Sequence, residues 1–354
     1  MAEIFIIYYH KILPKWGFDV FYKTFDLEMK ILKSFYNVVT LDEIEYYIKE
    51  DKKPIKPTVA ITFDDGYLDN FVYAYPILKK YKLKATIFPI ASRILKTELV
   101  RPTLEDYWNN KVSFNDLHKP KTVKVANLEY LKFGIKEAED WDFLSTAELN
   151  KMKDVFEIGG HAYVHSRVFY DDEIVDFYDG SNGHWSFYYA YEEEPKIGYP
   201  ILKSKNNLAV ERSFVKNEVK EYIKSLDKSY FRQKDWKIKL KEVLLKKYDK
   251  ITYKESTQER KERVIKELEE SKNMLESMIN QKVRHFAYPF GHYDDLLVEI
   301  VKQFFETAYT TEKDVVNPNT DLHKIPRYAV AKDISSFFAI LGKAKLKGRS
   351  KTWK

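Results

Sequence analysis

Cysteine is absent from the 354-residue sequence, which excludes both disulfide bonds and thiolate metal ligands. Any bound metal ion must therefore be held by histidine, aspartate or glutamate side chains. The chain also has no apolar run near the roughly 20 residues that a membrane-spanning helix needs. Its first apolar stretch, "EIFIIYY", is short, follows no basic residues and precedes no small-residue cleavage site, so we predict no secretion signal and expect a cytoplasmic protein.

A large excess of charge of one sign is also lacking. The 60 basic and 54 acidic residues leave a net charge of +6, and lysine and glutamate are interleaved, as is typical of a solvated surface. We therefore expect no nucleic-acid partner. Residues 343–354 differ, because this tail has six basic residues and no acidic one. It is either a frayed soluble end or a segment for peripheral contact with an anionic membrane surface.

Strands and helices alternate along the N-terminal part of the chain. Short apolar, β-branched runs indicate strands that are buried on both faces, and apolar residues at helical spacing indicate helices between them. The predicted strands are residues 3–9, 58–63 and 85–90, and the predicted helices are residues 25–35, 41–50 and 66–81. Because the connections are short, successive βα units predict a parallel sheet, either closed or doubly wound.

The alternation of strands and helices resumes near the C-terminus after a long segment that lacks it. Helix starts are marked by capping boxes, for example Thr40 with Glu43 and Ser145 with Glu148. The further strands are predicted at 156–160, 283–291, 306–311 and 323–330, and a long amphipathic helix is predicted at 256–279. We interpret residues 1–170 and 256–342 as one domain, and residues 171–255 as a mostly helical insertion within it.

Acidic and imidazole side chains follow two of these strands directly. Asp64 and Asp65 end the strand in "VAITFDDG", although a buried carboxylate is costly unless it is paired or binds a metal. His161 and His165 follow the strand at 156–160, and on one helical turn their i, i+4 spacing would aim both rings at one point. The histidines alone could be ordinary surface residues. Together with an aspartate they predict a catalytic metal site.

Three motifs in order resemble the polysaccharide deacetylase family: "TFDDG", then "GGHAYVHS", then "FAYPFG". An N-terminal "YYHKI" and a "VVTLDEI" element add to the resemblance, which covers most of residues 1–170 and 256–335. It implies a distorted (β/α)7-type barrel. It also implies a metal-dependent hydrolase that removes N-acetyl, or sometimes O-acetyl, groups from sugars.

The resemblance also implies roles for individual residues. Asp64 would be the general base, and Asp65 would bind a divalent metal, zinc by analogy, together with His161 and His165. The metal would lower the pKa of a bound water, which acts as the nucleophile, and would polarise the acetyl carbonyl. The backbone N–H of Phe290 would help to stabilise the oxyanion.

The sequence departs from the family pattern at two residues: the arginine that supports the catalytic aspartate and the histidine that acts as the general acid. Ala287 stands where many members have an arginine that supports the catalytic aspartate. Arg327 is the candidate replacement because a fixed arginine would keep Asp64 ionised, although a structural salt bridge would also explain it. The histidine that protonates the leaving amine has no clear match. His323 and His10 are candidates for this acid, and a water molecule is the remaining option.

Aromatic residues near the predicted site have two interpretations. Tyr288 and Phe290 either line the substrate pocket or belong to the core. The "HWSFYYAYEEEP" segment of the insertion either stacks on sugar rings or forms a small core of its own.

From these observations we expect a sugar N-deacetylase. Its substrate would be a polysaccharide, an oligosaccharide or a lipid- or nucleotide-linked precursor. An amidohydrolase or esterase of a non-sugar substrate, and a non-catalytic carbohydrate-binding protein on the same barrel, are the alternatives.

Overall fold

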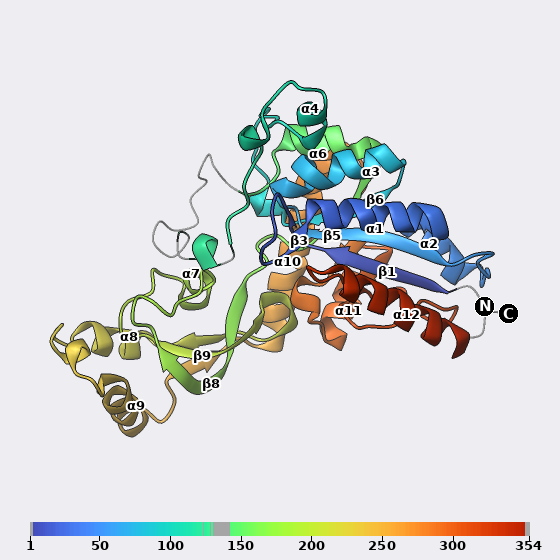
Figure 1. Cartoon of the computed structure of the whole chain (residues 1–354). Coiled ribbons are helices and arrows are strands. Elements are labelled where there is room, and N and C mark those ends of the chain that lie inside the picture. The colour runs from blue at the N-terminus through green and yellow to red at the C-terminus, as the bar shows by residue number, and fades with distance from the viewer. Residues whose placement is uncertain (1–2, 123, 128, 130–141, 351–354) are drawn as a thin grey trace.

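A parallel β-sheet forms the centre of the molecule (Figure 1). The computed structural model describes residues 3–122, 124–127, 129 and 142–350. The strand order is β14-β1-β5-β6-β7, β4 pairs with the first half of β5, and every pair is parallel. These strands are β1 (Ile4–Tyr9), β4 (Asn37–Val39), β5 (Thr58–Asp65), β6 (Ala85–Pro89), β7 (Phe156–Ile158) and β14 (Tyr328–Ala329). The α/β class expected from the sequence is therefore present.

Helices connect the strands and cover the sheet. They are α1 (Tyr22–Phe35), α2 (Leu41–Lys49), α3 (Tyr75–Tyr81), α4 (Leu104–Trp108), α6 (Thr146–Lys151), α10 (Thr257–Ile279), α11 (Asp295–Val301) and α12 (Ile334–Ser350). The predicted capping boxes begin α2 and α6. Helix α12 runs through residues 343–350, so this part of the basic tail is helical, and residues 351–354 lie outside the described part. No helix in the described ranges combines the length and apolarity needed to cross a bilayer.

A second pair of parallel strands lies next to the main sheet. It consists of β12 (His285–Ala287) and β13 (Thr307–Tyr309). Single parallel bridges join Gly160, just after β7, to Phe286, and Tyr309 to Ile325, just before β14. The carboxyl ends of β5, β7 and β12 consequently meet at one place, where parallel α/β proteins bind their ligands.

The long insertion extends away from the sheet, at the lower left of Figure 1. It contains β8 (Arg167–Phe177), β9 (Pro200–Asn206), β10 (Ser213–Val215), β11 (Thr252–Lys254), α7 (Phe187–Tyr191), α8 (Asn217–Lys224) and α9 (Trp236–Lys247). A short parallel pair, β2 (Ile12–Leu13) with β3 (Val20–Phe21), lies elsewhere, after β1.

The insertion contains the expected helices, α7 to α9, but it is mixed α and β and not mostly helical. An antiparallel pair, β8 with β9, is its main element, and register shifts between Phe169 and Asp176 interrupt the side-chain alternation that would have revealed the strand. The insertion also has its own apolar cluster, which includes Tyr191, Tyr199 and Trp236. Of the "HWSFYYAYEEEP" segment, Phe187 and Tyr191 belong to this core, whereas Trp185 does not, so the core interpretation holds for part of the segment.

Candidate active site

The two aspartates lie at the carboxyl end of β5, the central strand of the sheet. Asp64 and Asp65 are only 3% and 7% exposed. Asp65 adopts a left-handed backbone conformation with φ of 71°, which is uncommon for a residue other than glycine. Gly66 follows, also with positive φ, and a Cβ atom there would collide with Pro89 on β6. This tight turn directs the two neighbouring carboxylates to different partners.

A loop rather than a helical turn carries the two histidines. Ala162 and His165 have φ values of 64° and 58°, so the segment cannot be helical, and the predicted helical turn was wrong. Backbone N–H groups of Ala91 and Ser92 donate to the carbonyls of Ala162 and Tyr163 and hold the loop in place. The spacing of the rings is thus set by two left-handed residues that the sequence does not reveal.

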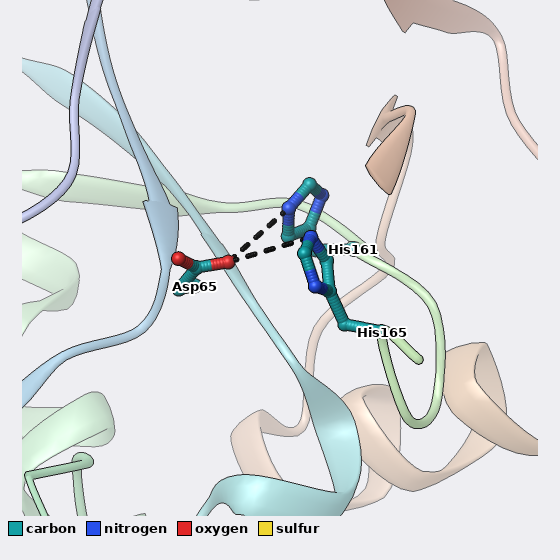
Figure 2. A group of neighbouring side chains, drawn as sticks. All are labelled: Asp65, His161 and His165. Atoms are coloured by element: carbon teal, nitrogen blue, oxygen red, sulfur yellow. Dashed lines mark ion pairs between the residues drawn. The ribbon is translucent and has the colours of Figure 1, made fainter. Parts of the chain in front are cut away.

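Asp65, His161 and His165 converge on one point (Figure 2). Asp65 Oδ1 lies 3.4 Å from Nε2 of His161 and 3.6 Å from Nε2 of His165. The three potential ligand atoms all lie within 4.8 Å of one another. The structure therefore brings together the three residues predicted as ligands.

These residues fit a divalent metal ion. In a tetrahedral zinc site, ligands about 2.0–2.2 Å from the ion lie roughly 3.3–3.6 Å apart, which matches the separations from Asp65. The buried Oδ1 of Asp65 has no hydrogen-bond partner in the described part of the chain. His161 donates from Nδ1 to the carbonyl of Ala287 at 2.8 Å, which leaves Nε2 free to bind a cation.

The charges of the site favour the same arrangement. Burial raises the pKa of Asp65, but His165 and His161 together lower it by a larger amount. The pKa of Asp65 therefore lies well below the ordinary value. Burial lowers the pKa of His165 to about 3, which keeps this imidazole neutral as metal binding requires. For His161, burial lowers the pKa, but the nearby carboxylates of Asp65 and Asp64 raise it by a larger amount, so its pKa lies above the ordinary value.

Asp64 is held by Arg327. The guanidinium donates two parallel hydrogen bonds to the carboxylate, with N–O distances of 2.7 and 2.9 Å. Arg327 is completely buried and also donates to the carbonyl of Thr310 and the hydroxyl of Thr62. Burial raises the pKa of Asp64, but Arg327 and His161 together lower it by a larger amount. The pKa of Asp64 therefore lies below the ordinary value. The ion pair expected between Arg327 and Asp64 is present in the structure.

A cavity of about 490 Å³ lies in front of these residues. His10 and Phe290 line it together with Asp64, Asp65, His161 and His165. Phe290 has a φ of 57°, and its ring contacts that of His165 in a tilted arrangement at a centroid distance of 4.3 Å. The structure thus places His10 and Phe290 beside the predicted ligands.

Two other predicted residues lie elsewhere. His323 contacts the carbonyl of Phe305 through Nε2 at 2.9 Å and is not among the residues lining the cavity. Tyr288 is completely buried and donates from its hydroxyl to the carbonyl of His323. These positions argue against His323 as the acid and against Tyr288 as a substrate contact; Tyr288 is a core residue.

Several cavity residues were missed by the sequence interpretation. Lys11 and Asp142 form a buried ion pair of 2.6 Å, and the Lys11 ammonium lies 4.0 Å from the ring centroid of Tyr67. His184 and Trp185 of the insertion, which begin the segment considered for stacking on sugar rings, also line the cavity and were therefore not missed. Lys11 belongs to the quoted "YYHKI", but its partner lies 131 positions away in no recognisable motif. Only the fold brings these residues together.

A second group with potential metal ligands consists of Asp42, Glu45 and His285. Here the ring nitrogens of His285 already contact Thr307, Asp42 and Glu157, and Arg284 pairs with both Asp42 and Glu45. The group is therefore a compensated ion-pair network and not a second candidate active site.

Comparison with known proteins agrees with the motifs. The Bacillus subtilis protein YxkH is 45% identical over 94 residues, which cover 26% of this chain and 34% of YxkH. A Staphylococcus aureus protein named poly-beta-1,6-N-acetyl-D-glucosamine N-deacetylase is 35% identical over 136 residues, covering 33% of this chain and 46% of the relative. These alignments span about a third to just under half of the curated relatives.

Solved structures share the fold over nearly the whole chain. A de-N-acetylase from Aggregatibacter actinomycetemcomitans has a TM-score of 0.58 and 16% identity, covering 96% of this chain and all of that one. IcaB from Ammonifex degensii has a TM-score of 0.56, also with 16% identity, over 98% of both chains. The sequence model of the polysaccharide deacetylase family matches residues 51–179 and 248–307, just over half of the chain. With its motif residues gathered in one cavity, this chain belongs to the polysaccharide deacetylase family.

Proposed function

We propose that the protein is a metal-dependent hydrolase that removes an N-acetyl group from a sugar. The observation that carries this proposal is the convergence of Asp65, His161 and His165 beside a separate, arginine-paired Asp64. A divalent ion bound to the three residues, zinc by analogy, would activate water as a nucleophile and polarise the acetyl carbonyl. The fold proposed with it is a distorted barrel of seven strands, supported by the two bridges that link β12 and β13 to the main sheet.

Asp64 has the properties of a general base in this reaction. Because Arg327 lowers its pKa, the carboxylate is ionised at neutral pH and can take a proton from water. The two hydrogen bonds from Arg327 also fix its orientation. Asp64 thereby remains separate from Asp65, whose Oδ1 points at the histidines.

The structure also suggests how the other charges of the reaction are handled. His10 lines the cavity with an exposed side chain and could protonate the leaving amine, whereas His323 lies elsewhere. We therefore propose His10 as the general acid. The backbone N–H of Phe290, beside His165, is the proposed donor to the oxyanion.

For the substrate we propose a glycan that contains N-acetylglucosamine. This choice is supported by the printed activity of the Staphylococcus aureus relative, and by a cavity whose walls include Trp185 and Phe290, aromatic side chains suited to sugar rings.

The direct test is acetate release from N-acetylglucosamine oligomers by metal-free and zinc-loaded protein. We expect release only with metal, and a loss of at least about a hundredfold in kcat for Asp64→Asn, the lower range for loss of a general base. Stoichiometric metal binding without turnover of any acetylated compound, and with no effect of Asp64→Asn, would instead indicate a carbohydrate-binding protein. Turnover of acetylated amides or esters that lack a sugar, but not of the oligomers, would indicate a non-sugar substrate.

A further inference from the structure

A second cavity lies next to the catalytic one, within the insertion. It has a volume of about 550 Å³ and shares the lining residues His184 and Phe290 with the catalytic cavity, so the two cavities adjoin at these residues. Apolar side chains such as Phe169, Phe187 and Leu202 form much of its wall. A substrate that is bound at the metal site could therefore extend into the insertion.

The distinctive feature of this second cavity is the charge of Arg167. Its guanidinium donates to the hydroxyl and the carbonyl of Ser204, at 3.1 and 2.6 Å, and lies 5.4 Å from the ring centroid of Phe290. No carboxylate in the described part of the chain forms an ion pair with Arg167, and the residues lining the cavity include no aspartate or glutamate. Lys203, the other cation in the wall, is already paired with Glu173. Arg167 is thus a half-buried cation without a counter-ion.

His184 adds a neutral hydrogen-bond donor at the junction of the two cavities. Its Nδ1 accepts a hydrogen bond from the backbone N–H of Ser186 at 3.2 Å, so the proton of the neutral ring is on Nε2. Burial and the nearby charge of Arg167 lower the pKa of His184 to about 4, which keeps the ring neutral at physiological pH. The backbone N–H of Arg167 donates to Ser186 Oγ, so the arginine and the histidine loop are held together.

We propose that Arg167 and His184 bind an oxyanion carried by the substrate, a phosphate ester or a carboxylate on a sugar next to the one that is deacetylated. This inference rests on the proposed function, because it assumes that the acetylated sugar occupies the catalytic cavity. A guanidinium recognises phosphate and carboxylate groups with paired donors. The hydrogen bonds to Ser204 and the cation–π contact with Phe290 fix Arg167 before the ligand arrives, which lowers the entropic cost of binding.

A purely structural role for Arg167 makes a different prediction. The Arg167 guanidinium lies over the ring of Phe290, and Phe290 contacts the ring of His165, so loss of the arginine could simply displace a metal ligand. In that case all substrates would be affected alike. If the arginine binds an oxyanion, the loss depends on whether the substrate carries one.

The experiment compares kcat/KM for N-acetylglucosamine oligomers of one length that are neutral, phosphorylated or carboxylated on the neighbouring sugar. The zinc-loaded full chain is used. We expect the ratio of anionic to neutral kcat/KM to fall about ten- to a hundredfold in Arg167→Gln, the effect of losing a charge-assisted hydrogen bond. In Arg167→Lys, which keeps the positive charge, the ratio of anionic to neutral kcat/KM should fall less. An equal fall for all substrates, or no fall, would overturn the proposal. If the fall in kcat/KM is larger for the phosphorylated oligomers, the oxyanion is a phosphate; if it is larger for the carboxylated oligomers, the oxyanion is a carboxylate.

Lys205→Gln is the matched control. It removes one positive charge from an exposed residue of β9 that does not itself line the second cavity, although its ammonium lies 5.2 Å from the ring centroid of the wall residue Tyr170. We expect its substrate ratio to change less than threefold. A change as large as that of Arg167→Gln would show a general effect of charge and contradict a specific site.

A binding measurement separates this inference from the proposed function. Inorganic phosphate is titrated calorimetrically into the zinc-loaded full chain and into Arg167→Gln at equal zinc content. We expect about tenfold weaker binding in the variant. Equal phosphate affinities would overturn the anion site even if acetate release is observed. A difference in affinity without release of acetate from any substrate would leave the anion site intact and reject the deacetylase.

Discussion

Arg327 and Asp64 form a buried ion pair with two hydrogen bonds, although they are 263 positions apart in the chain. Next to this pair, Asp65 points away from the arginine and toward two histidines. Two adjacent carboxylates are thereby given different neighbours. This difference explains how one strand can supply both a metal ligand and a free base.

The first prediction concerns Arg327. Because its charge lowers the pKa of Asp64, Arg327→Met should raise this pKa and move the acidic limb of the kcat/KM profile to higher pH. The unpaired buried carboxylate should also lower the free energy of unfolding by about 3–5 kcal/mol. Arg327→Lys, which keeps the charge, should move the limb less. A pH profile of Arg327→Met that coincides with wild type would show that the arginine does not control the base.

The second prediction separates the two aspartates. Asp64→Asn should still bind about one zinc ion per chain but lose acetate release, whereas Asp65→Asn should lose zinc affinity because one of three ligands is gone. Metal analysis after dialysis, together with an acetate assay, measures both properties. Loss of zinc from Asp64→Asn, or normal zinc affinity in Asp65→Asn, would reverse the assignment.

The third prediction compares the two candidate acids. His10 lines the cavity, so His10→Asn should lower kcat about a hundred- to ten-thousandfold, the usual range for a general acid. His323→Asn should change kcat less than threefold, because its ring contacts the carbonyl of Phe305 outside the cavity. Comparable activities of the two variants would leave protonation of the amine to a water molecule.

The fourth prediction is a pH dependence of stability that comes from His285. Burial lowers the pKa of His285, but hydrogen bonds to Asp42 and Glu157 raise it to about 9. The unfolded value is about 6.5. Because the folded-state pKa is the higher one, the protonated His285 stabilises the fold by its full amount below about pH 6.5. This contribution disappears as the pH rises through about 9. His285 should contribute a loss of about 3 kcal/mol over this range in denaturant unfolding, and His285→Asn should make the slope of stability against pH shallower by that amount; an unchanged slope would contradict the assignment.

The fifth prediction tests the separate core of the insertion. Leu240 is completely buried on α9, so Leu240→Ala should cost about 2–5 kcal/mol of unfolding free energy. Ile238 on the same helix is 64% exposed, and Ile238→Ala should change stability by less than about 0.5 kcal/mol. Zinc affinity should stay at the wild-type level in both variants. Loss of zinc in Leu240→Ala would show that the insertion core supports the metal loop.

Much of this site could be predicted because its signals are local. The strand that ends in Asp64 and Asp65 has an apolar pattern of its own, and the capping boxes at Thr40 and Ser145 occupy four consecutive residues each. The histidine pair was recognised by its spacing, but its conformation was not. The left-handed backbone at Ala162 and His165 depends on contacts with Ala91 and Ser92, which no local pattern reports.

Features that depend on distant residues were harder to predict. The pairing of Arg327 with Asp64 was only one of two options, since a buried arginine and a surface arginine look alike in sequence. The hairpin of β8 and β9 was missed because its bulges disrupt the alternation of side chains. Arg167 was not noticed at all, because its lack of a counter-ion becomes visible only when β9 and Phe290 are placed around it.

The most direct test of the central claim is anomalous diffraction at the zinc edge from crystals of the zinc-loaded protein. The account predicts one strong peak about 2.0–2.2 Å from a carboxylate oxygen of Asp65 and from Nε2 of both His161 and His165. A peak at Asp42, Glu45 and His285 instead, or no ordered zinc between the residues shown in Figure 2, would contradict it.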